Sequence, residues 1–184
     1  MIRHTAVHVE RDTCYGQSDV VLKDTFLAES QEMKKKLPDL KNAFFYSSPL
    51  TRCRNLVNQI VQSDKVIFDN RLLELNFGDW ELLKWDEIDQ PLLQTWMDNF
   101  VECPCPNGES FQQMALRVNI FLADIVNQDV DQVVVFTHAG VIRCIISEVL
   151  GMPLKNAFRL QVDFGSITKL NVVDKLFKLS YLNL

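Results

Sequence analysis

The sequence predicts an α/β protein with a mainly parallel β-sheet. Strand-like and helix-like segments alternate along the chain, a pattern typical of sheets whose parallel strands are joined by helices. The 184 residues are 47% apolar and 23% charged, as in an ordinary globular protein, and they contain neither a repeat nor a low-complexity segment. At about 150 residues per domain, we expect residues 1–184 to form one domain.

Two short apolar runs in the first half of the chain predict strands. Residues 43–46 (AFFY) are the first, and they lead into Ser47-Ser48-Pro49, which predicts an N-cap and a first-turn proline for a helix over residues 50–61. Residues 66–68 predict the next strand. The first two or three residues are expected to form a strand that leads into His4.

The clearest helix of the second half begins after Ser110. Ser110 and Gln113 form a capping box, and apolar residues then recur at helical spacing as far as Ile125. The β-branched run at residues 132–136 (QVVVF) predicts a buried strand after this helix.

The remaining segments predict one more helix and a pair of strands. Residues 140–150 follow a helical pattern that Gly151, with Pro153 beyond it, is expected to stop. Residues 166–173 and 176–182 resemble two strands that a tight turn at Asp174-Lys175 joins.

Residues 82–106 lie between the two halves and are rich in large side chains, among them Trp85, Trp96, Met97 and Phe100. We expect a helical insertion here, near the functional site, although its helical pattern is weaker. Two interpretations stay open, because such an insertion often covers a site but also occurs as a peripheral pair of helices packed on the core.

The charge balance narrows the classes of partner. Lys and Arg total 19 against 24 Asp and Glu, and this net charge of −5 argues against a general nucleic-acid binder and against a protein that binds anionic membranes. No apolar run approaches the roughly 20 residues that span a bilayer, and the start is typical of neither a signal nor a transit sequence. We therefore expect a cytoplasmic monomer or homodimer.

The cysteines and histidines give little support for a metal. The five cysteines are scattered, and Cys103 and Cys105 lack the paired spacing of a four-ligand zinc site. His8 follows His4 by four residues in a polar loop, where we expect a surface residue before a substrate contact or a metal ligand. We therefore expect neither a metal nor another cofactor.

Four basic side chains are expected to meet at one edge of the sheet. Arg3 and His4 follow the first presumed strand, while His138 follows the strand at residues 132–136. Arg52 lies at the start of a helix, where its charge opposes the helix dipole unless an anion is near. Because ligands of α/β sheets bind outside the carboxyl ends of the strands, these residues predict a site for an anion such as a phosphoryl group.

Five short elements, in order along residues 3–143, resemble the motifs of the histidine phosphatase superfamily, which includes the cofactor-dependent phosphoglycerate mutases. They are Arg3-His4-Thr5, Ser47-Ser48-Pro49-Leu50 with Arg52, Leu73-Glu74 with Phe77-Gly78 and Trp80-Glu81, Pro106-Asn107-Gly108-Glu109-Ser110, and Thr137-His138-Ala139-Gly140-Val141-Ile142-Arg143. Each element alone is weak, whereas the ordered set is specific. The resemblance implies a phosphoglycerate mutase-like, three-layer α/β/α sandwich.

The resemblance also implies the two reacting side chains. His4 would be the nucleophile that becomes phosphohistidine, and Glu74 would protonate the leaving alkoxide and then accept a proton from water. Since His4 attacks through an unprotonated nitrogen, we expect its other nitrogen to donate to a backbone carbonyl. We expect burial, against Phe77 and Trp80, to raise the pKa of Glu74.

The same resemblance assigns the groups that bind phosphate. Arg3, Arg52 and His138 would hold the phosphate and stabilise charge on its oxygens. The backbone amides of Ala139 and Gly140, at a helix start, could add donors.

Three features depart from the family pattern. Only two residues precede Arg3, where a strand of the family normally leads into this motif, so we expect the first strand to be very short or clipped by a late start. Thr5 replaces the usual Gly after the nucleophile, and Glu10 stands where the family often has Asn. These departures leave open a protein that binds a phosphate ligand without turnover.

The sequence of one loop favours a particular substrate among those of the family. Cys14-Tyr15-Gly16-Gln17-Ser18-Asp19 resembles the α-ribazole phosphate phosphatases of cobalamin assembly, which implies that Gln17 and Ser18 lie close to the phosphate. Tyr15 would stack on the substrate's ring or equally pack within the loop. We therefore expect a phosphomonoesterase whose small-molecule substrate is α-ribazole 5′-phosphate. A phosphoglycerate mutase, a broad-specificity phosphatase and a phosphohistidine protein phosphatase, which would need an open cleft, are the enzymatic alternatives.

Overall fold

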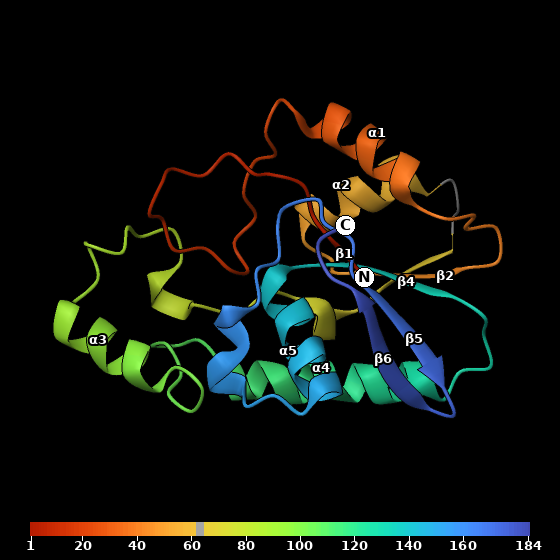
Figure 1. Ribbon diagram of the computed structural model, residues 1–184. Helices are drawn as coiled ribbons and strands as arrows, with labels where there is room; N and C mark the ends of the chain where they lie inside the picture. Colours follow the sequence, from red (N-terminus) through yellow and green to blue (C-terminus); the bar gives the residue numbers. More distant parts are fainter. Residues whose placement is uncertain (62–64) are drawn as a thin grey trace.

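The computed structural model describes residues 1–61 and 65–184, and at its centre lies a parallel sheet (Figure 1). Its strands are β1 (Ile2–Arg3), β2 (Phe44–Ser47), β3 (Val66–Phe68) and β4 (Val133–Thr137). They stand in the order β1-β4-β2-β3, and each neighbouring pair is parallel. The predicted fold class is confirmed, and β1 is very short, at two residues.

Helices cover both faces of the sheet (Figure 1). On one face lie α1 (Phe26–Lys36) and α2 (Thr51–Ile60), and on the other lie α4 (Phe111–Val126) and α5 (Ala139–Leu150). Successive side chains of β4 enter the two cores in turn, because Val134 belongs to the core that contains Leu56 of α2, whereas Val135 belongs to the core that contains Met114 of α4. The three-layer α/β/α sandwich is confirmed.

The chain ends in an antiparallel hairpin that forms a second sheet from β5 (Lys169–Val173) and β6 (Leu176–Tyr181). Asp174 and Lys175 join its strands with φ of 51° and 62°, left-handed values typical of a two-residue hairpin turn. The predicted turn is confirmed, and both strands lie inside the predicted ranges.

Local signals predict two helix ends correctly. Ser110 and Gln113 make both hydrogen bonds of a capping box at the start of α4. Gly151 ends α5 with a φ of 62°.

The predicted start of α2 is wrong. The helix begins at Thr51 with Leu50 as N-cap, so Pro49 precedes the helix instead of opening it. The cause is an acceptor from a distant loop, since the Thr51 amide and hydroxyl both donate to the Asp19 carboxylate at 2.8 Å. Asp19 thereby satisfies the amide that a local cap would otherwise bind.

Residues 82–106 hold one helix, α3 (Gln90–Asn99), so the segment is helical in part but is not the pair of helices that one of the two interpretations expected. α3 lies to the left of the sheet in Figure 1. Trp96 of α3 contacts the rings of Trp80, Trp85 and Phe100 at centroid distances of 5.5, 6.4 and 6.2 Å and joins the core shared by α4 and α5. The 3₁₀ helices are η1 (Asn70–Leu72), η2 (Gly78–Trp80) and η3 (Leu154–Arg159).

None of the helices in the described part of the chain has the length and apolar character needed to cross a membrane. Within residues 1–61 and 65–184, no three His, Cys, Asp or Glu side chains are grouped so as to hold a metal ion. The five cysteines are free thiols, and Cys105 is buried while Cys103 is half-buried.

Candidate active site

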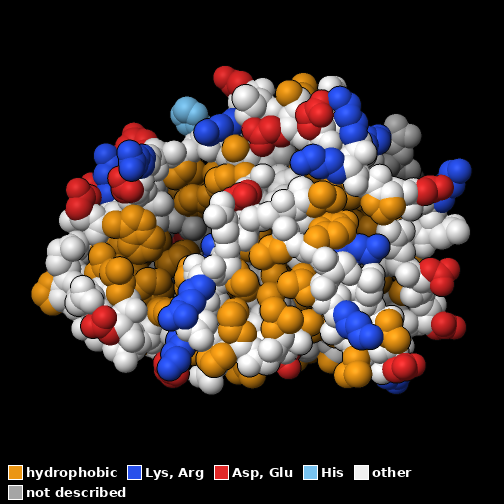
Figure 2. Space-filling model, viewed as in Figure 1, with side chains coloured by type: hydrophobic (Ala, Val, Ile, Leu, Met, Phe, Trp, Pro, Cys, Tyr) orange, Lys and Arg blue, Asp and Glu red, His pale blue; other side chains and the backbone are white. Residues whose placement is uncertain are grey.

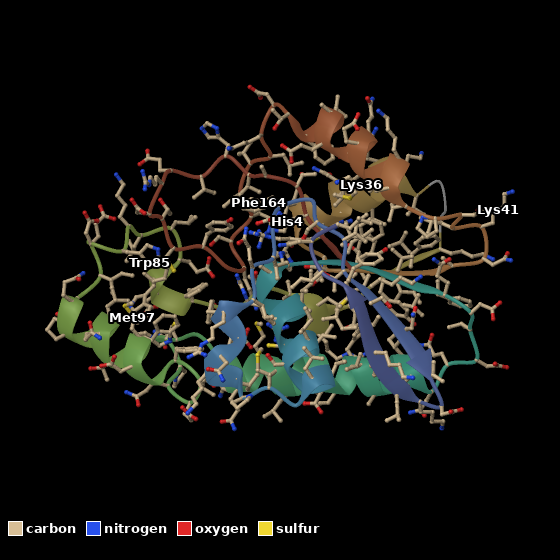
Figure 3. All side chains as sticks on the ribbon, in the orientation of Figure 1. His4, Lys36, Lys41, Trp85, Met97 and Phe164 are labelled. Carbon is tan, nitrogen blue, oxygen red and sulfur yellow. The ribbon has the colours of Figure 1, made fainter. Side chains whose placement is uncertain are left out.

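Three strand ends bring the predicted residues together. β1 leads into His4, β4 into His138 and β2 into Ser48, and the parallel pairing of these strands places all three residues at one edge of the sheet. The rings of His4 and His138 meet edge to face with their centroids 5.2 Å apart. Figure 3 shows His4 near the centre of the molecule, beside Phe164, with Trp85 to the left.

His4 is held in one tautomer. Its side chain is buried, and Nδ1 lies 2.8 Å from the carbonyl oxygen of Thr5. Because a carbonyl only accepts, Nδ1 carries the proton and Nε2 keeps its lone pair, as predicted. Burial, together with the cations of Arg52 and Arg3, lowers the pKa of His4 well below its ordinary value. His4 is therefore a neutral imidazole whose Nε2 can act as a nucleophile.

Arg52 is 0% exposed and donates to three uncharged acceptors. Nη1 bonds the Ser18 carbonyl at 2.9 Å, Nη2 bonds the Gly16 carbonyl, and Nε lies 3.3 Å from Nδ1 of His138. Among the residues that the structure describes, no carboxylate forms an ion pair with this guanidinium. Its charge is thus buried without an opposite charge, which suits an anionic ligand.

Both ring nitrogens of His138 are engaged. Since a guanidinium only donates, Nδ1 accepts from Arg52, and the ring proton lies on Nε2, which donates to Ser48 Oγ at 2.7 Å. Burial, Arg52 and His4 lower the pKa of His138 well below its ordinary value, so this ring is also neutral. The buried thiol of Cys53 lies 3.6 Å from Nε2, and burial raises its pKa to about 12.

Arg3 is the second cation of the site. Nη1 donates to the Val162 carbonyl at 2.6 Å, and the guanidinium carbon lies 3.6 Å from the centroid of the Phe164 ring. Burial lowers the pKa of Arg3, and the nearby Glu74 carboxylate opposes this change. The Nε atom of Arg3 is buried and has no partner in the described part of the chain, so a ligand oxygen could take this donor.

Glu74 reaches the site from the segment that follows β3. Its Oε2 accepts from the Gly140 amide at 3.2 Å, and its Oε1 accepts from the Leu75 amide at 3.1 Å. A Cβ atom at position 140 would lie 2.2 Å from Oε1, so glycine leaves the room that this carboxylate occupies. The Gly140 amide therefore serves Glu74 instead of a phosphate, contrary to our prediction, while Ala139 is buried at the first position of α5.

The enclosure of Glu74 is looser than predicted. The residue is half-buried, and Phe77 and Trp80, which we expected to enclose it, both pack on Trp96. The Phe77 ring also lies next to Gly16, where an added Cβ would come within 2.7 Å of it. The aromatic residues of this motif thus connect the insertion to the active-site loop.

The loop at residues 14–18 is held by Glu81, whose role no sequence pattern indicated beyond its place at the end of the third motif. Its carboxylate accepts from the amides of Gly16, Gln17 and Ser18 at 2.9, 2.8 and 3.1 Å. Burial raises the pKa of Glu81, but the amide hydrogen bonds outweigh burial and leave this pKa below its ordinary value. The Gly16 and Ser18 carbonyls on this loop are the acceptors of Arg52.

The three loop residues predicted to bind substrate, Gln17, Ser18 and Tyr15, make different contacts from one another. Gln17 donates from Nε2 to the Glu74 carbonyl at 3.0 Å, and Ser18 uses its backbone to bind neighbouring side chains. Tyr15 lies over the cationic groups, with its ring centroid 5.7 Å from the Arg52 guanidinium carbon. Burial raises the pKa of the Tyr15 hydroxyl in spite of the neighbouring guanidinium groups. Among these three residues, Tyr15 is therefore the one whose side chain lies next to the Arg52 guanidinium.

The residues that depart from the family pattern do not disrupt this arrangement. Thr5 is buried, and its carbonyl holds His4 while its hydroxyl lacks a partner among the described residues. Glu10 is exposed, and its Oε2 lies 3.1 Å from Nζ of Lys84 in the insertion, so this carboxylate pairs with a lysine outside the cationic site. His8 is exposed, as expected of a surface residue.

Aromatic and apolar side chains border the site. Phe164, beside His4, is 41% exposed, and Phe158 is 52% exposed with the Arg143 guanidinium 5.1 Å from its ring centroid. Figure 2 shows a hollow toward the left of the molecule with hydrophobic side chains gathered around it. The Phe77 and Trp85 rings pair at 5.9 Å in the aromatic cluster beside α3. Aromatic rings therefore lie next to the cationic site, with Phe164 beside His4.

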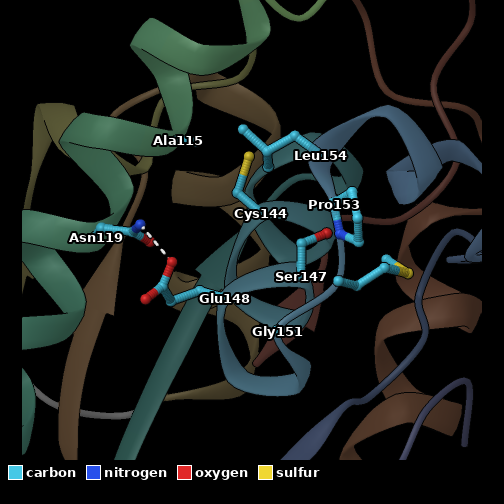
Figure 4. Close-up of a pocket in the computed structure, with 9 residues that line it drawn as sticks. Ala115, Asn119, Cys144, Ser147, Glu148, Gly151, Pro153 and Leu154 are labelled. Carbon is cyan, nitrogen blue, oxygen red and sulfur yellow. Dashed lines mark hydrogen bonds between the residues drawn. The ribbon is translucent and has the colours of Figure 1, made fainter.

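A separate cavity of about 330 Å³ lies between α4 and the end of α5 (Figure 4). Its lining includes Cys144, Ser147 and Leu154, and the amide of Asn119 donates to Glu148 at its rim at 2.9 Å. None of the residues predicted for the active site lines this cavity.

A family model for the histidine phosphatase superfamily (branch 1) matches residues 1–184. Among curated proteins, the adenosylcobalamin/alpha-ribazole phosphatase of Escherichia coli K12 is 26% identical over 100% of this chain and 94% of its own length. A Shigella boydii protein named "Probable phosphoglycerate mutase GpmB" is 29% identical over 96% of this chain and 86% of its own length.

The solved structures agree on the fold. The crystal structure of the alpha-ribazole phosphatase from Shigella flexneri matches 100% of this chain and 94% of its own chain, with a TM-score of 0.90 and 24% identity. At this identity, the match supports the architecture of the sandwich and not a particular substrate.

Proposed function

Because the chain belongs to the histidine phosphatase superfamily (branch 1), we propose that it hydrolyses phosphomonoesters through a phosphohistidine formed on His4. The observation that supports this step best is the neutral, buried His4, whose Nδ1 proton is bound by the Thr5 carbonyl. In the first step, Nε2 attacks phosphorus, the bond from phosphorus to the ester oxygen breaks, and Glu74 gives its proton to the leaving oxygen.

In the second step, water attacks the phosphohistidine. The ionised Glu74 takes a proton from this water, the bond between phosphorus and Nε2 breaks, and inorganic phosphate leaves with His4 restored. Glu74 therefore ends the cycle protonated, as it began, and no oxidant or external acid is consumed.

Three side chains would hold the transferred group. Arg52 brings a buried cation and Arg3 a half-buried one, and the unpartnered Nε of Arg3 is a free donor for a phosphate oxygen. His138 would exchange Ser48 Oγ for a phosphate oxygen as the acceptor of its Nε2 proton. Donors fixed in a site poor in water stabilise the charge on the transferring oxygens without reorganising.

We propose α-ribazole 5′-phosphate as the leading substrate. Its leaving group carries a flat aromatic base, which suits the exposed rings of Phe158 and Phe164 and the Tyr15 ring beside the arginines. The similarity to the Escherichia coli phosphatase and the loop at residues 14–19 support the same substrate. The insertion at residues 82–106 would border the base, within one catalytic domain.

The experiment compares phosphate release from α-ribazole 5′-phosphate, ribose 5-phosphate and p-nitrophenyl phosphate. Ribose 5-phosphate is the matched control, because it lacks the base alone. We expect the highest kcat/KM with α-ribazole 5′-phosphate, and an equal or higher value with ribose 5-phosphate would refute the substrate. His4→Ala should abolish release and acid-labile labelling of the protein, whereas the exposed His8→Ala should retain both. Full activity in His4→Ala would refute the mechanism.

A phosphoglycerate mutase is the second candidate, because the Shigella boydii relative carries that name at 29% identity. A mutase would transfer the phosphoryl group between two positions of phosphoglycerate instead of releasing it to water. Incubation with 3-phosphoglycerate, followed by separation of the isomers and phosphate, distinguishes the two reactions.

A further inference from the structure

Arg117 and Glu109 form an ion pair behind Glu74. The Nη2 and Nε atoms of Arg117 lie 2.6 and 3.1 Å from the two carboxylate oxygens of Glu109, a bidentate geometry. Their side chains are 20% and 17% exposed, so solvent screens the pair only in part. Glu109 belongs to the fourth motif, whereas Arg117 lies inside α4 and outside every motif.

The other hydrogen bonds of this pair hold the segment that carries Glu74. Arg117 Nη1 donates to the carbonyls of Arg71 and Leu73, both at 2.8 Å, and Nη2 donates to the Glu74 carbonyl at 3.0 Å. Glu109 Oε1 accepts from the Asn76 amide at 3.0 Å. The backbone on both sides of Glu74 is therefore tied to one ion pair.

We propose that Arg117 and Glu109 are positioning residues for Glu74 in the proposed proton transfer, and the inference rests on that proposed function. Neither residue needs to touch substrate. Their planar groups fix the backbone at residue 74, and this backbone sets where the carboxylate meets the leaving oxygen. A displacement of about 1 Å at a reacting group can lower a rate by about 100-fold. A lysine cannot reproduce the contacts, because its single ammonium lacks the guanidinium fork.

The chemistry supplies a readout that general destabilisation would not change. The kcat/KM value covers steps up to formation of phosphohistidine, in which the leaving oxygen needs a proton only when it is a poor leaving group. p-Nitrophenolate leaves without one, whereas the alkoxide of an alkyl phosphate such as glycerol 2-phosphate does not. The ratio of the two kcat/KM values, alkyl over aryl, therefore reports the position of Glu74.

The experiment measures this ratio for the wild type, Glu109→Gln, Arg117→Lys and Glu74→Gln. Arg71→Lys is the matched control, because Arg71 pairs with Asp69 and Asp124 at 2.7 and 2.5 Å on the same segment without holding the Glu74 backbone. Thermal unfolding of each variant identifies the temperature at which all are folded, and Glu109→Gln keeps the side-chain shape if Arg117→Lys does not fold.

We expect Glu74→Gln to lower the ratio most, and Glu109→Gln and Arg117→Lys to lower it at least tenfold. Arg71→Lys should leave the ratio unchanged. If the Glu109 and Arg117 variants lose alkyl and aryl activity equally, or lose neither, the positioning role is wrong. If Glu74→Gln itself leaves the ratio unchanged, the proposed role of Glu74 fails, which separates that failure from the failure of this inference.

Discussion

Arg52, which is buried, and Arg117, which is half-buried, both bind backbone carbonyls, but among the described residues only Arg117 has a carboxylate partner. Arg117 pairs with Glu109 through two hydrogen bonds and then holds three carbonyls. Arg52 holds two carbonyls and a neutral His138, and no residue in the described part of the chain neutralises it. The two arginines also lie on opposite sides of the proposed reaction, one with the phosphate and one with the leaving group.

On the proposed function, this difference separates a cation that would bind the phosphate from a cation that stabilises the fold. A buried charge without an opposite charge costs stability, which the protein recovers when an anion binds. A paired charge gains little from a further anion and instead stabilises the backbone around it. The following predictions test this division, in order of decreasing size.

The largest expected effect is on catalysis by Arg52→Met. The substitution removes the cation beside His4 that we propose to bind the phosphate, so we expect kcat/KM for p-nitrophenyl phosphate to fall by about 10³-fold, or about 4 kcal/mol. The measurement is steady-state hydrolysis with saturating and limiting substrate. A loss below about tenfold would show that Arg52 has a structural role like that of Arg117. The distinction between a ligand-binding arginine and a structural arginine would then be wrong.

The next effect is on stability, and here we expect the Arg117 variant to lose more than the Arg52 variant. Arg117→Met leaves the half-buried Glu109 carboxylate without its partner, so we expect the free energy of unfolding to fall by about 3 kcal/mol. Arg52→Met leaves two carbonyls unpaired but also removes an uncompensated charge, so its loss should be about 1 kcal/mol. Urea unfolding in phosphate-free buffer measures both. An equal or larger loss in Arg52→Met would contradict the comparison.

Stabilisation by a bound ligand should also distinguish the two arginines, with a slightly smaller change in free energy. Inorganic phosphate at about 100 times its Kd should stabilise the wild type by about 2.7 kcal/mol, since it binds only the folded state. Arg117→Lys should keep this gain, whereas Arg52→Met should lose it. Thermal unfolding against phosphate concentration, with chloride at matched ionic strength as the control, gives the result. Equal stabilisation of the two variants would overturn the assignment of Arg52 to phosphate.

The parts of the site that could be predicted from the sequence are those fixed by strand ends. His4 and His138 meet because parallel strands bring their carboxyl ends to one edge, a rule that needs only the order of the elements. The capping box at Ser110 was equally predictable, because both of its hydrogen bonds are local. The start of α2 was not, because its acceptor is Asp19, more than thirty residues earlier in the chain.

The contacts that could not be predicted join side chains to distant backbone. Glu81 binds three successive amides of one loop, and Arg117 binds carbonyls of another. Every residue has an amide or a carbonyl, so such partners leave no pattern in residue types. The position of Gly140 shows the same limit, since only the folded chain reveals that Glu74 fills the space beside it.

Counted per histidine and per pH unit, the smallest predicted effect is the pH dependence of stability that the two rings of the phosphate side produce. The pKa values of His4 and His138 lie well below the ordinary 6.5, so below this pH the unfolded chain binds protons that the folded chain does not. The free energy of unfolding should therefore fall as pH drops from 7 to 5, by up to about 1.4 kcal/mol per pH unit for each histidine. Glu81 has a lowered pKa and acts in a more acidic range, since its contribution is lost only below its ordinary value of 4.5.

Two variants assign this slope to the phosphate side. His4→Gln should remove one part of the slope between pH 7 and pH 5, and the rest belongs to His138 and to the amino group of Met1, whose pKa burial lowers to about 5. Arg52→Met should also make the slope shallower, since Arg52 is the largest cause after burial for the lowered pKa of both rings. Arg117→Lys keeps its charge and should leave the slope unchanged. Urea unfolding at pH 7, 6 and 5 measures all four proteins, and a slope that His4→Gln does not change would show that the buried histidines do not set the acid limit of this fold.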